Sequence, residues 1–290
     1  MDMINNYNFK CKKNPKEIIE CIKKFGIAYV PNYIEEKDIS PIKKIFYDCF
    51  DKNQNRKMVT YRHYKHPTNP GEQLLIDTKI ANEEGYPEFQ NYLKSNFLYE
   101  VCEYFYGKNK FTFNDNIRFT NLIESKNPIL PWHFDRTQAL KFWIYVEDAD
   151  KSCGALEYCP GTHWEGKYRS AYDILTGKTI DKIRNDIPNH RIQNPITLEG
   201  KAGDLFIFDA DGFHRGGVIE KNKKRSVIRA DSYPINEEKN WTKNIKNIFK
   251  INWWISSKLN LSRLLNQNGY LGTRTISAKM QDESRSRDDY

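Results

Sequence analysis

The sequence predicts an α+β protein in which helices precede an all-β core, either a barrel or a sandwich. Two features of the chain lead to this prediction. Residues 15–107 contain segments with apolar side chains at helical spacing, and from about residue 111 short runs rich in aromatic and β-branched residues alternate with turn signals. The chain has 290 residues, of which 39% are hydrophobic, and this is enough for one large core.

The N-terminal part is expected to contain three helices and one strand. Residues 15–27 carry isoleucine and phenylalanine side chains at helical spacing, and Gly26 marks the end of this helix. We expect a short strand at 27–33 and amphipathic helices at 35–50 and 89–107.

Residues 52–90 are polar and rich in Asn, Gly and Pro, so we expect an irregular loop there. A loop this long in a compact chain is usually functional or mobile. His63 and His66 within it have a spacing seen in zinc sites, but no cysteine or further histidine accompanies them. We therefore interpret this segment as a mobile loop that can close over a substrate.

The β part is predicted from six runs bounded by turn signals. They are FTFNDNIRFTNLIES, ALKFWIYVED, GALEYCPG, HRIQNPITL, GDLFIFDA and RSVIRADSY. From residue 237 the pattern returns to an amphipathic helix, and the last residues are polar and frayed. The apolar side of this C-terminal helix is expected to pack on the β core or against a second subunit. A basic, tryptophan-bearing amphipathic helix can also lie on a membrane surface.

Composition argues against several classes of protein. The net charge is +8, but lysines and acids alternate along the chain without a dense basic block, so nucleic-acid binding is not expected. The N-terminus lacks the apolar segment of a signal peptide and no apolar run reaches the length of a membrane span, so we expect a cytoplasmic protein. The cysteines form no C-x-x-C pair and are interpreted as reduced thiols: Cys11, Cys21, Cys49, Cys102, Cys153 and Cys159.

A histidine and a carboxylate stand two positions apart in PWHFDRTQALKFWIYV, residues 131–146. In a strand, His133 and Asp135 point to the same face. An isolated H-x-D is a weak signal, but a second histidine, His214, ends another predicted strand in GDLFIFDADGFHRGG. Two histidines and one carboxylate are the ligand set that holds non-haem Fe(II) with open positions for an organic ligand and O₂.

Such an iron centre needs an electron source, commonly 2-oxoglutarate, whose far carboxylate requires a fixed cation. A guanidinium is best suited because it can bind both carboxylate oxygens. Arg225, eleven residues after His214, lies on the next predicted strand. Arg229 has the same strand parity, so spacing alone does not separate the two arginines.

The order of these motifs resembles the phytanoyl-CoA dioxygenase (PhyH-like) family of Fe(II)/2-oxoglutarate-dependent oxygenases. The motifs are WHFD, then LKFWIYVEDADKSCGALEYCPGTH, then AGDLFIFDADGFHRGG, then Arg225, and the opening FGIAYVPNYIEEKDI is also similar. The resemblance covers roughly residues 15–235. It implies a double-stranded β-helix (jelly-roll, cupin-like) core at about 111–235 with N-terminal helices packed on it. The dioxygenase domain would span 1–236, and 237–290 would be a C-terminal helical extension.

Residue by residue, the resemblance implies that His133, Asp135 and His214 bind the iron and form the catalytic centre. It implies that Arg225 binds 2-oxoglutarate. Trp143, eleven residues before the glycine of SCGALEYCPGTH, stands where some members place a tryptophan near the cosubstrate.

Further candidates to line the same pocket are Lys141 and Tyr145, which share one strand face with Trp143. Thr120 stands where relatives often have a polar contact to the cosubstrate. Gly216, two residues after His214, departs from the serine that relatives often have there, so one cosubstrate hydrogen bond is missing or comes from elsewhere. The segment after Asp135 is also short, which changes the rim of the pocket and hence the substrate.

Each assignment has a plainer alternative. His133 and Asp135 would then be a structural pair beside an unrelated surface histidine, Arg225 a surface charge, and Trp143 a core side chain. His163 in PGTHWEG is interpreted as a structural turn residue, because three ligands are already found.

The sequence therefore predicts an Fe(II)- and 2-oxoglutarate-dependent dioxygenase that uses O₂ to hydroxylate a small molecule and releases succinate and CO₂. Related halogenases have a small residue in place of the carboxylate, so Asp135 favours a hydroxylase. The alternative is a cupin-like protein that binds a metal or a small ligand without turnover; nucleic-acid modification would require a basic groove that the sequence lacks. The expected assembly is a monomer or homodimer. The segments 52–90 and 165–195 are expected to shape the pocket, and neither contains a motif that identifies the substrate.

Overall fold

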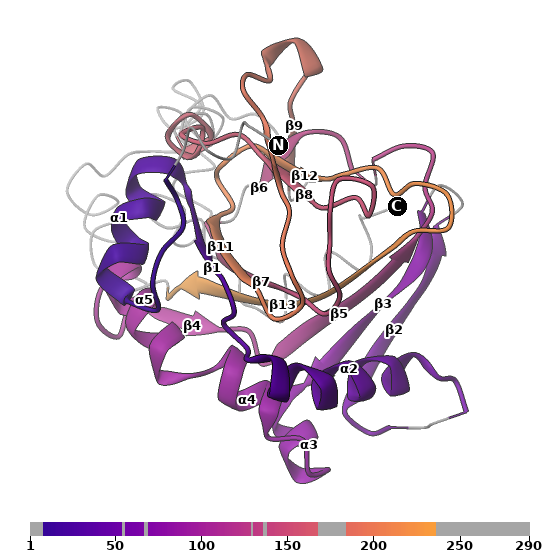
Figure 1. The fold of residues 1–290 in the computed structure, drawn as a ribbon. Coiled ribbons are helices and arrows are strands. Elements are labelled where there is room, and N and C mark those ends of the chain that lie inside the picture. The colour runs from indigo at the N-terminus through magenta and orange to yellow at the C-terminus, as the bar shows by residue number, and fades with distance from the viewer. Residues whose placement is uncertain are drawn as a thin grey trace, which may run out of the picture.

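Strand pairing organises the chain into two antiparallel sheets with helices beside the larger one (Figure 1). The computed structural model describes residues 8–53, 56–66, 69–128, 130–135, 138–167 and 184–235. The large sheet contains, in spatial order, β1 (Ile27–Val30), β11 (Leu205–Asp209), β7 (Leu140–Tyr145), β13 (Lys224–Pro234), β5 (Asn116–Ile123), β3 (Asn69–Asp77) and β2 (Val59–His66), with β4 (Phe111–Phe113) also paired to β13. The small sheet contains β10 (Ile196–Leu198), β8 (Leu156–Tyr158), β12 (His214–Gly216), β6 (His133–Asp135) and β9 (Arg184–Asp186).

From β5 onward the chain crosses repeatedly between the two sheets. The strands β5, β7, β11 and β13 lie in the large sheet, while β6, β8, β10 and β12 lie in the small one. The predicted α+β class, with helices followed by antiparallel strands, is confirmed. The predicted strand at 190–198 is shorter than expected: residues 189–191 form a 3-10 helix (Asn189–Arg191), and β10 begins only after Pro195.

The core has two layers, one on each face of the large sheet. In β7, Phe142 and Ile144 belong to the layer under the helices, whereas Trp143 and Tyr145 belong to the layer between the sheets. This alternation follows from the two-residue period of a strand. All six residues of β7 are buried, because both of its faces are covered.

The helices are α1 (Pro15–Phe25), α2 (Glu36–Phe50), α3 (Thr78–Glu83), α4 (Glu88–Leu93) and α5 (Asn96–Tyr106). The first ends where the sequence predicts: Gly26 takes a left-handed conformation with φ of 80°. A side chain at Gly26 would also collide with the Tyr158 hydroxyl, so α1 can meet the small sheet only through a glycine.

The prediction of an irregular loop at 52–90 is wrong. This segment contains the hairpin of β2 and β3, followed by α3. Strand β3 pairs with β5 from Gly71 to Asp77, and its Leu74 and Ile76 are fully buried. Pairing with a strand far along the chain stabilises an extended conformation that the polar local composition does not suggest.

The predicted single helix at 89–107 is two helices, α4 and α5. Ser95 interrupts it, and its side chain accepts a hydrogen bond from the backbone N–H of Leu98, which starts α5. The Tyr33 hydroxyl lies 2.6 Å from the Tyr92 carbonyl oxygen and 3.0 Å from Ser95 Oγ, so a tertiary contact fixes this break.

Two predictions fall outside the described residues. These are the C-terminal helical extension at 237–290 and the central part of the expected loop at 165–195, residues 168–183. Within the part of the chain that the structure describes, no helix is long and apolar enough to cross a membrane.

Candidate metal centre

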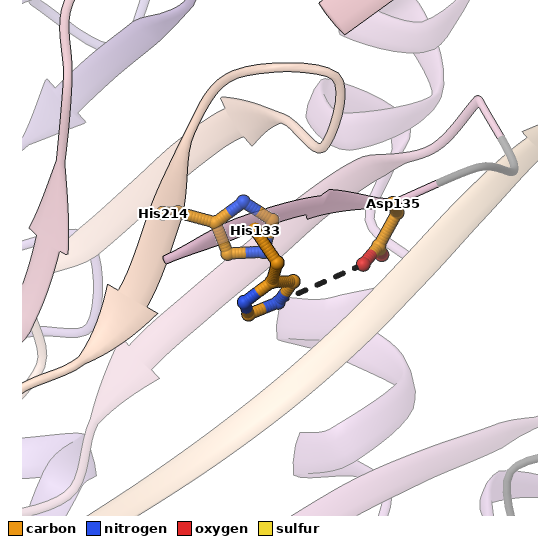
Figure 2. Close-up of side chains that lie close together, drawn as sticks. All are labelled: His133, Asp135 and His214. Carbon is orange, nitrogen blue, oxygen red and sulfur yellow. Dashed lines mark ion pairs between the residues drawn. The ribbon is translucent and has the colours of Figure 1, made fainter. Parts of the chain in front are cut away.

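Three side chains of types that can ligate a metal converge between the sheets. His133 on β6 lies directly opposite His214 on the neighbouring strand β12, and their ring centroids are 4.4 Å apart. Asp135 follows two residues later on β6, so strand parity brings its carboxylate to the same side (Figure 2). One ligand atom from each residue lies within 4.8 Å of the others. The structure thus brings together the three residues that the sequence predicts as ligands.

Both imidazoles are held by a backbone carbonyl two residues earlier, in the segment that leads into their strand. His133 Nδ1 lies 2.8 Å from the carbonyl oxygen of Pro131, and His214 Nδ1 lies 2.8 Å from that of Gly212. A carbonyl oxygen only accepts, so each Nδ1 carries the proton and each Nε2 presents a lone pair. This tautomer is the one that a histidine ligand needs when it binds a metal through Nε2.

The electrostatic environment also favours ligation. His133, Asp135 and His214 are 5%, 4% and 4% exposed. Burial holds the pKa of His214 well below its usual value, and its interactions with His133 and Lys141 lower it further, whereas the Asp135 carboxylate raises it. The neutral imidazole binds metal, so burial prepares this side chain as a ligand. Two neutral imidazoles and one carboxylate are a ligand set that fits a mononuclear Fe(II) ion.

Arg225 lies in the layer between the sheets, at the start of β13. Its side chain is 3% exposed, and its guanidinium donates a short hydrogen bond to the Gly154 carbonyl and lies 5.7 Å from the Trp143 ring. Within the described residues, Arg225 Nε and Trp143 Nε1 are buried without a hydrogen-bond partner. Two unsatisfied donors this close together fit a carboxylate-bearing ligand, since buried polar groups are normally paired.

Gly216 is packed against this guanidinium. A Cβ at Gly216 would lie 2.7 Å and 2.9 Å from the two terminal nitrogens of Arg225. The departure from serine at this position therefore has a steric reason: the arginine fills the space that a side chain would use.

Arg229, the alternative anchor, is engaged elsewhere. It lies opposite Trp143 on β7, and its guanidinium pairs with Asp231 at 3.1 Å. Arg225 is thus the more deeply buried of the two arginines and has no carboxylate partner within 4.0 Å in the described residues.

The remaining candidates lie on inward faces of the large sheet. Trp143 and Tyr145 are buried between the sheets, and Lys141 of the same face reaches the triad. Thr120 on β5 is buried. It lies opposite Val227 on β13, which in turn lies opposite Tyr145 on β7.

His163 is not part of the triad. His163 Nε2 lies 3.1 Å from the Lys23 carbonyl oxygen near the end of α1, so it packs between that helix and the small sheet. His63 and His66 belong to β2, and their side chains lie outside the described residues.

Two contacts of the site were not predicted from the sequence. Lys141 Nζ lies 2.6 Å from Asp135 Oδ2, and the Gly154 carbonyl accepts from Arg225. Strand parity signals that Lys141 faces the pocket, but it does not tell how far the side chain reaches. No sequence signal identifies a backbone carbonyl as a partner.

A buried triad of two histidines and a carboxylate on antiparallel strands is the donor set of the non-haem iron proteins. The sequence model of one family with this chemistry, Phytanoyl-CoA dioxygenase (PhyH), matches residues 103–227. This match confirms the family resemblance predicted from the sequence, and it includes all three triad residues. No curated protein matches the chain at a significant level.

Solved structures share the fold. The epimerase SnoN from nogalamycin biosynthesis, in complex with Fe³⁺, alpha ketoglutarate and nogalamycin RO, is 15% identical with a TM-score of 0.56, over 75% of this chain and 82% of that one. The non-heme alpha ketoglutarate dependent carbocyclase SnoK is 14% identical with a TM-score of 0.53, over 75% and 83%. At these identities the likeness establishes a common fold.

Proposed function

We propose that this protein is an Fe(II)- and 2-oxoglutarate-dependent dioxygenase that hydroxylates a C–H bond of a small molecule. The observation that carries the proposal is the buried triad, in which one possible ligand atom from each of the three side chains lies within 4.8 Å of the others. The unsatisfied Nε of Arg225 in the same layer supports a dicarboxylate as the second component. The family match over residues 103–227 supports the same class of reaction.

The alternation of strands between the two sheets supports a double-stranded β-helix, the jelly-roll core of such enzymes. In this proposal the core occupies about 111–235 of a dioxygenase domain at 1–236. In the structure the large sheet also contains strands from outside 111–235, namely β1 and the β2–β3 hairpin. Residues 237–290 would form a separate helical extension.

Each site residue has a defined task in the proposed reaction. His133, Asp135 and His214 would hold the metal, with the imidazoles kept in the ligating tautomer by the Pro131 and Gly212 carbonyls. Fe(II) with 2-oxoglutarate and O₂ supplies an oxidative decarboxylation that gives succinate and CO₂ and places one oxygen atom in the product.

The distal carboxylate of 2-oxoglutarate would bind the Arg225 guanidinium, and Trp143 Nε1 is a further donor beside it. Burial between the sheets excludes water, which strengthens this ion pair. Thr120 would face the same pocket from β5.

Hydroxylation is proposed because Asp135 retains its carboxylate. Solved structures of similar fold are described as an epimerase and a carbocyclase, so oxidation outcomes other than hydroxylation occur on this architecture. We further propose a cytoplasmic protein, monomeric or homodimeric, with a small-molecule substrate and no nucleic-acid partner. The C-terminal extension would contact the core, a second subunit or a membrane surface.

Anaerobic spectroscopy tests the site. Protein loaded with Fe(II) and 2-oxoglutarate is expected to show a metal-to-ligand charge-transfer band, which His133→Ala abolishes. The matched control is His190→Ala, because His190 is an exposed histidine of the 3-10 helix and should leave the band unchanged. Absence of the band in the natural protein, or its survival in His133→Ala, would refute the proposal.

Product analysis tests turnover. After admission of O₂, the protein is expected to convert 2-oxoglutarate to succinate, slowly alone and faster with a metabolite extract that contains the substrate. A protein that binds metal and 2-oxoglutarate but yields no succinate would instead be a cupin-like binder without turnover.

A further inference from the structure

Lys141 places a buried ammonium inside the metal centre. Its Nζ lies 2.6 Å from Asp135 Oδ2 and 3.5 Å from His214 Nε2, and the residue is only 4% exposed. The ring of Phe208 lies 5.8 Å from the same nitrogen. A lysine is almost never buried this deeply unless its charge is paired, and here the partner is the Asp135 carboxylate.

The contact with Lys141 divides the two oxygens of Asp135 between different tasks. Oδ2 is held by the ammonium, while Oδ1 is the oxygen that lies 3.9 Å from His133 Nε2. A charge-assisted hydrogen bond of this length fixes the carboxylate orientation. Asp135 is therefore set to offer one oxygen to a metal.

The charge of Lys141 also changes which ligands the centre favours. The Lys141 ammonium, 2.6 Å from Asp135 Oδ2 and 3.5 Å from His214 Nε2, offsets the negative charge of that carboxylate. A divalent ion bound by the same residues would add positive charge beside the ammonium in a dry environment, where like charges repel strongly. An anionic ligand that arrives with the ion offsets this excess.

We propose that Lys141 is a positioning residue that couples metal binding to anion binding. It fixes Asp135 as a one-oxygen ligand, opposes binding of the divalent ion alone, and favours binding of the ion together with a carboxylate. Only the identity of the anion, 2-oxoglutarate, rests on the proposed function. The effect on the metal alone does not depend on it.

Calorimetric titration with Mn(II), with and without saturating 2-oxoglutarate, tests the proposal. Lys141→Met keeps a long, unbranched side chain and removes the charge. This variant is expected to bind Mn(II) alone at least about tenfold more tightly than the natural protein. The gain in Mn(II) affinity caused by 2-oxoglutarate should shrink at least about tenfold, because the ammonium no longer attracts the carboxylate. Lys201→Met is the matched control, since Lys201 is an exposed lysine paired with Asp148, and it should change neither value.

A merely structural lysine predicts a different pattern. In that case Lys141→Met would bind Mn(II) more weakly or equally, and this result would overturn the proposal. Lys141→Gln retains a donor for Asp135 without the charge, so it gives the same test if the methionine variant does not fold. If the natural protein binds Mn(II) but 2-oxoglutarate leaves that affinity unchanged, the proposed function fails, while tighter Mn(II) binding by the variant still supports the role of Lys141. Absence of Mn(II) binding to the natural protein would overturn both.

Discussion

Replacing Arg225 by methionine separates the two arginines that sequence spacing leaves equivalent. Arg225 is buried, donates to the Gly154 carbonyl and has no carboxylate partner within 4.0 Å in the described residues, whereas Arg229 is paired with Asp231 at 3.1 Å. If Arg225 anchors 2-oxoglutarate, Arg225→Met removes a buried charge partner of the cosubstrate. Arg229→Met removes a charge that is already used within the protein.

The expected magnitude follows from the burial of this site. Removing one partner of a buried, hydrogen-bonded charge pair costs about 2–5 kcal/mol. At 1.4 kcal/mol for each factor of ten, the dissociation constant of 2-oxoglutarate should rise about 30-fold to several thousand-fold. Metal affinity in the absence of 2-oxoglutarate should change little, because a guanidinium stays protonated and has no lone pair to offer a metal ion.

The assay is titration of 2-oxoglutarate into anaerobic, Fe(II)-loaded protein, read from the charge-transfer band. Thermal unfolding of the free protein provides the structural control. Burial lowers the pKa of the Arg225 guanidinium, so the free protein already bears a cost for holding this charge. Its stability should therefore fall far less than its cosubstrate affinity. Weakened binding in Arg229→Met together with normal binding in Arg225→Met would refute the assignment.

Three further predictions concern the surroundings of the site and the fold. Gly216→Ala should weaken 2-oxoglutarate binding at least about threefold, measured in the same titration, because the new Cβ would displace the buried Arg225 guanidinium. Ser95→Ala should lower the free energy of unfolding by about 1 kcal/mol in urea denaturation, since it removes the N-cap of α5; an unchanged midpoint would contradict that role. Hydrogen peroxide should join Cys11 and Cys21, whose sulfurs are 3.1 Å apart, with both thiols oxidised to one disulfide and the peroxide reduced to water. Mass spectrometry of non-reduced peptides checks this, and peptides that stay unlinked after peroxide treatment would contradict it.

Part of the candidate metal site could be located from the sequence because it depends on local geometry. A two-residue strand period places His133 and Asp135 on one face. His214 is identified by its residue type at the end of another predicted strand, and its position opposite His133 comes from the pairing of β12 with β6. The same period separates Trp143 from Phe142, and the structure places them in different layers of the core.

Features that depend on distant partners could not be predicted in this way. The strand character of 69–77 comes from pairing with β5, whose partner residues lie about 40 to 50 positions further along the chain. The break between α4 and α5 involves the Tyr33 hydroxyl, which approaches Ser95 from another part of the protein. Local composition cannot encode either contact, because the same polar sequence is equally suited to a loop.

The two ends of the proposed cosubstrate pocket are built by different means, and this has a consequence for how the site tolerates change. The imidazoles are oriented by carbonyls only two residues away, at Pro131 and Gly212, so the metal end is fixed wherever β6 and β12 form. The arginine end requires three separate segments to meet, because Arg225 is held between Gly154 and Gly216. Sequence changes in the two sheets should therefore disturb cosubstrate binding well before they disturb metal binding. Lys141 lies on the strand face that carries Trp143, at the arginine end, and it contacts Asp135 at the metal end. We therefore expect the charge of Lys141 to couple binding at the two ends.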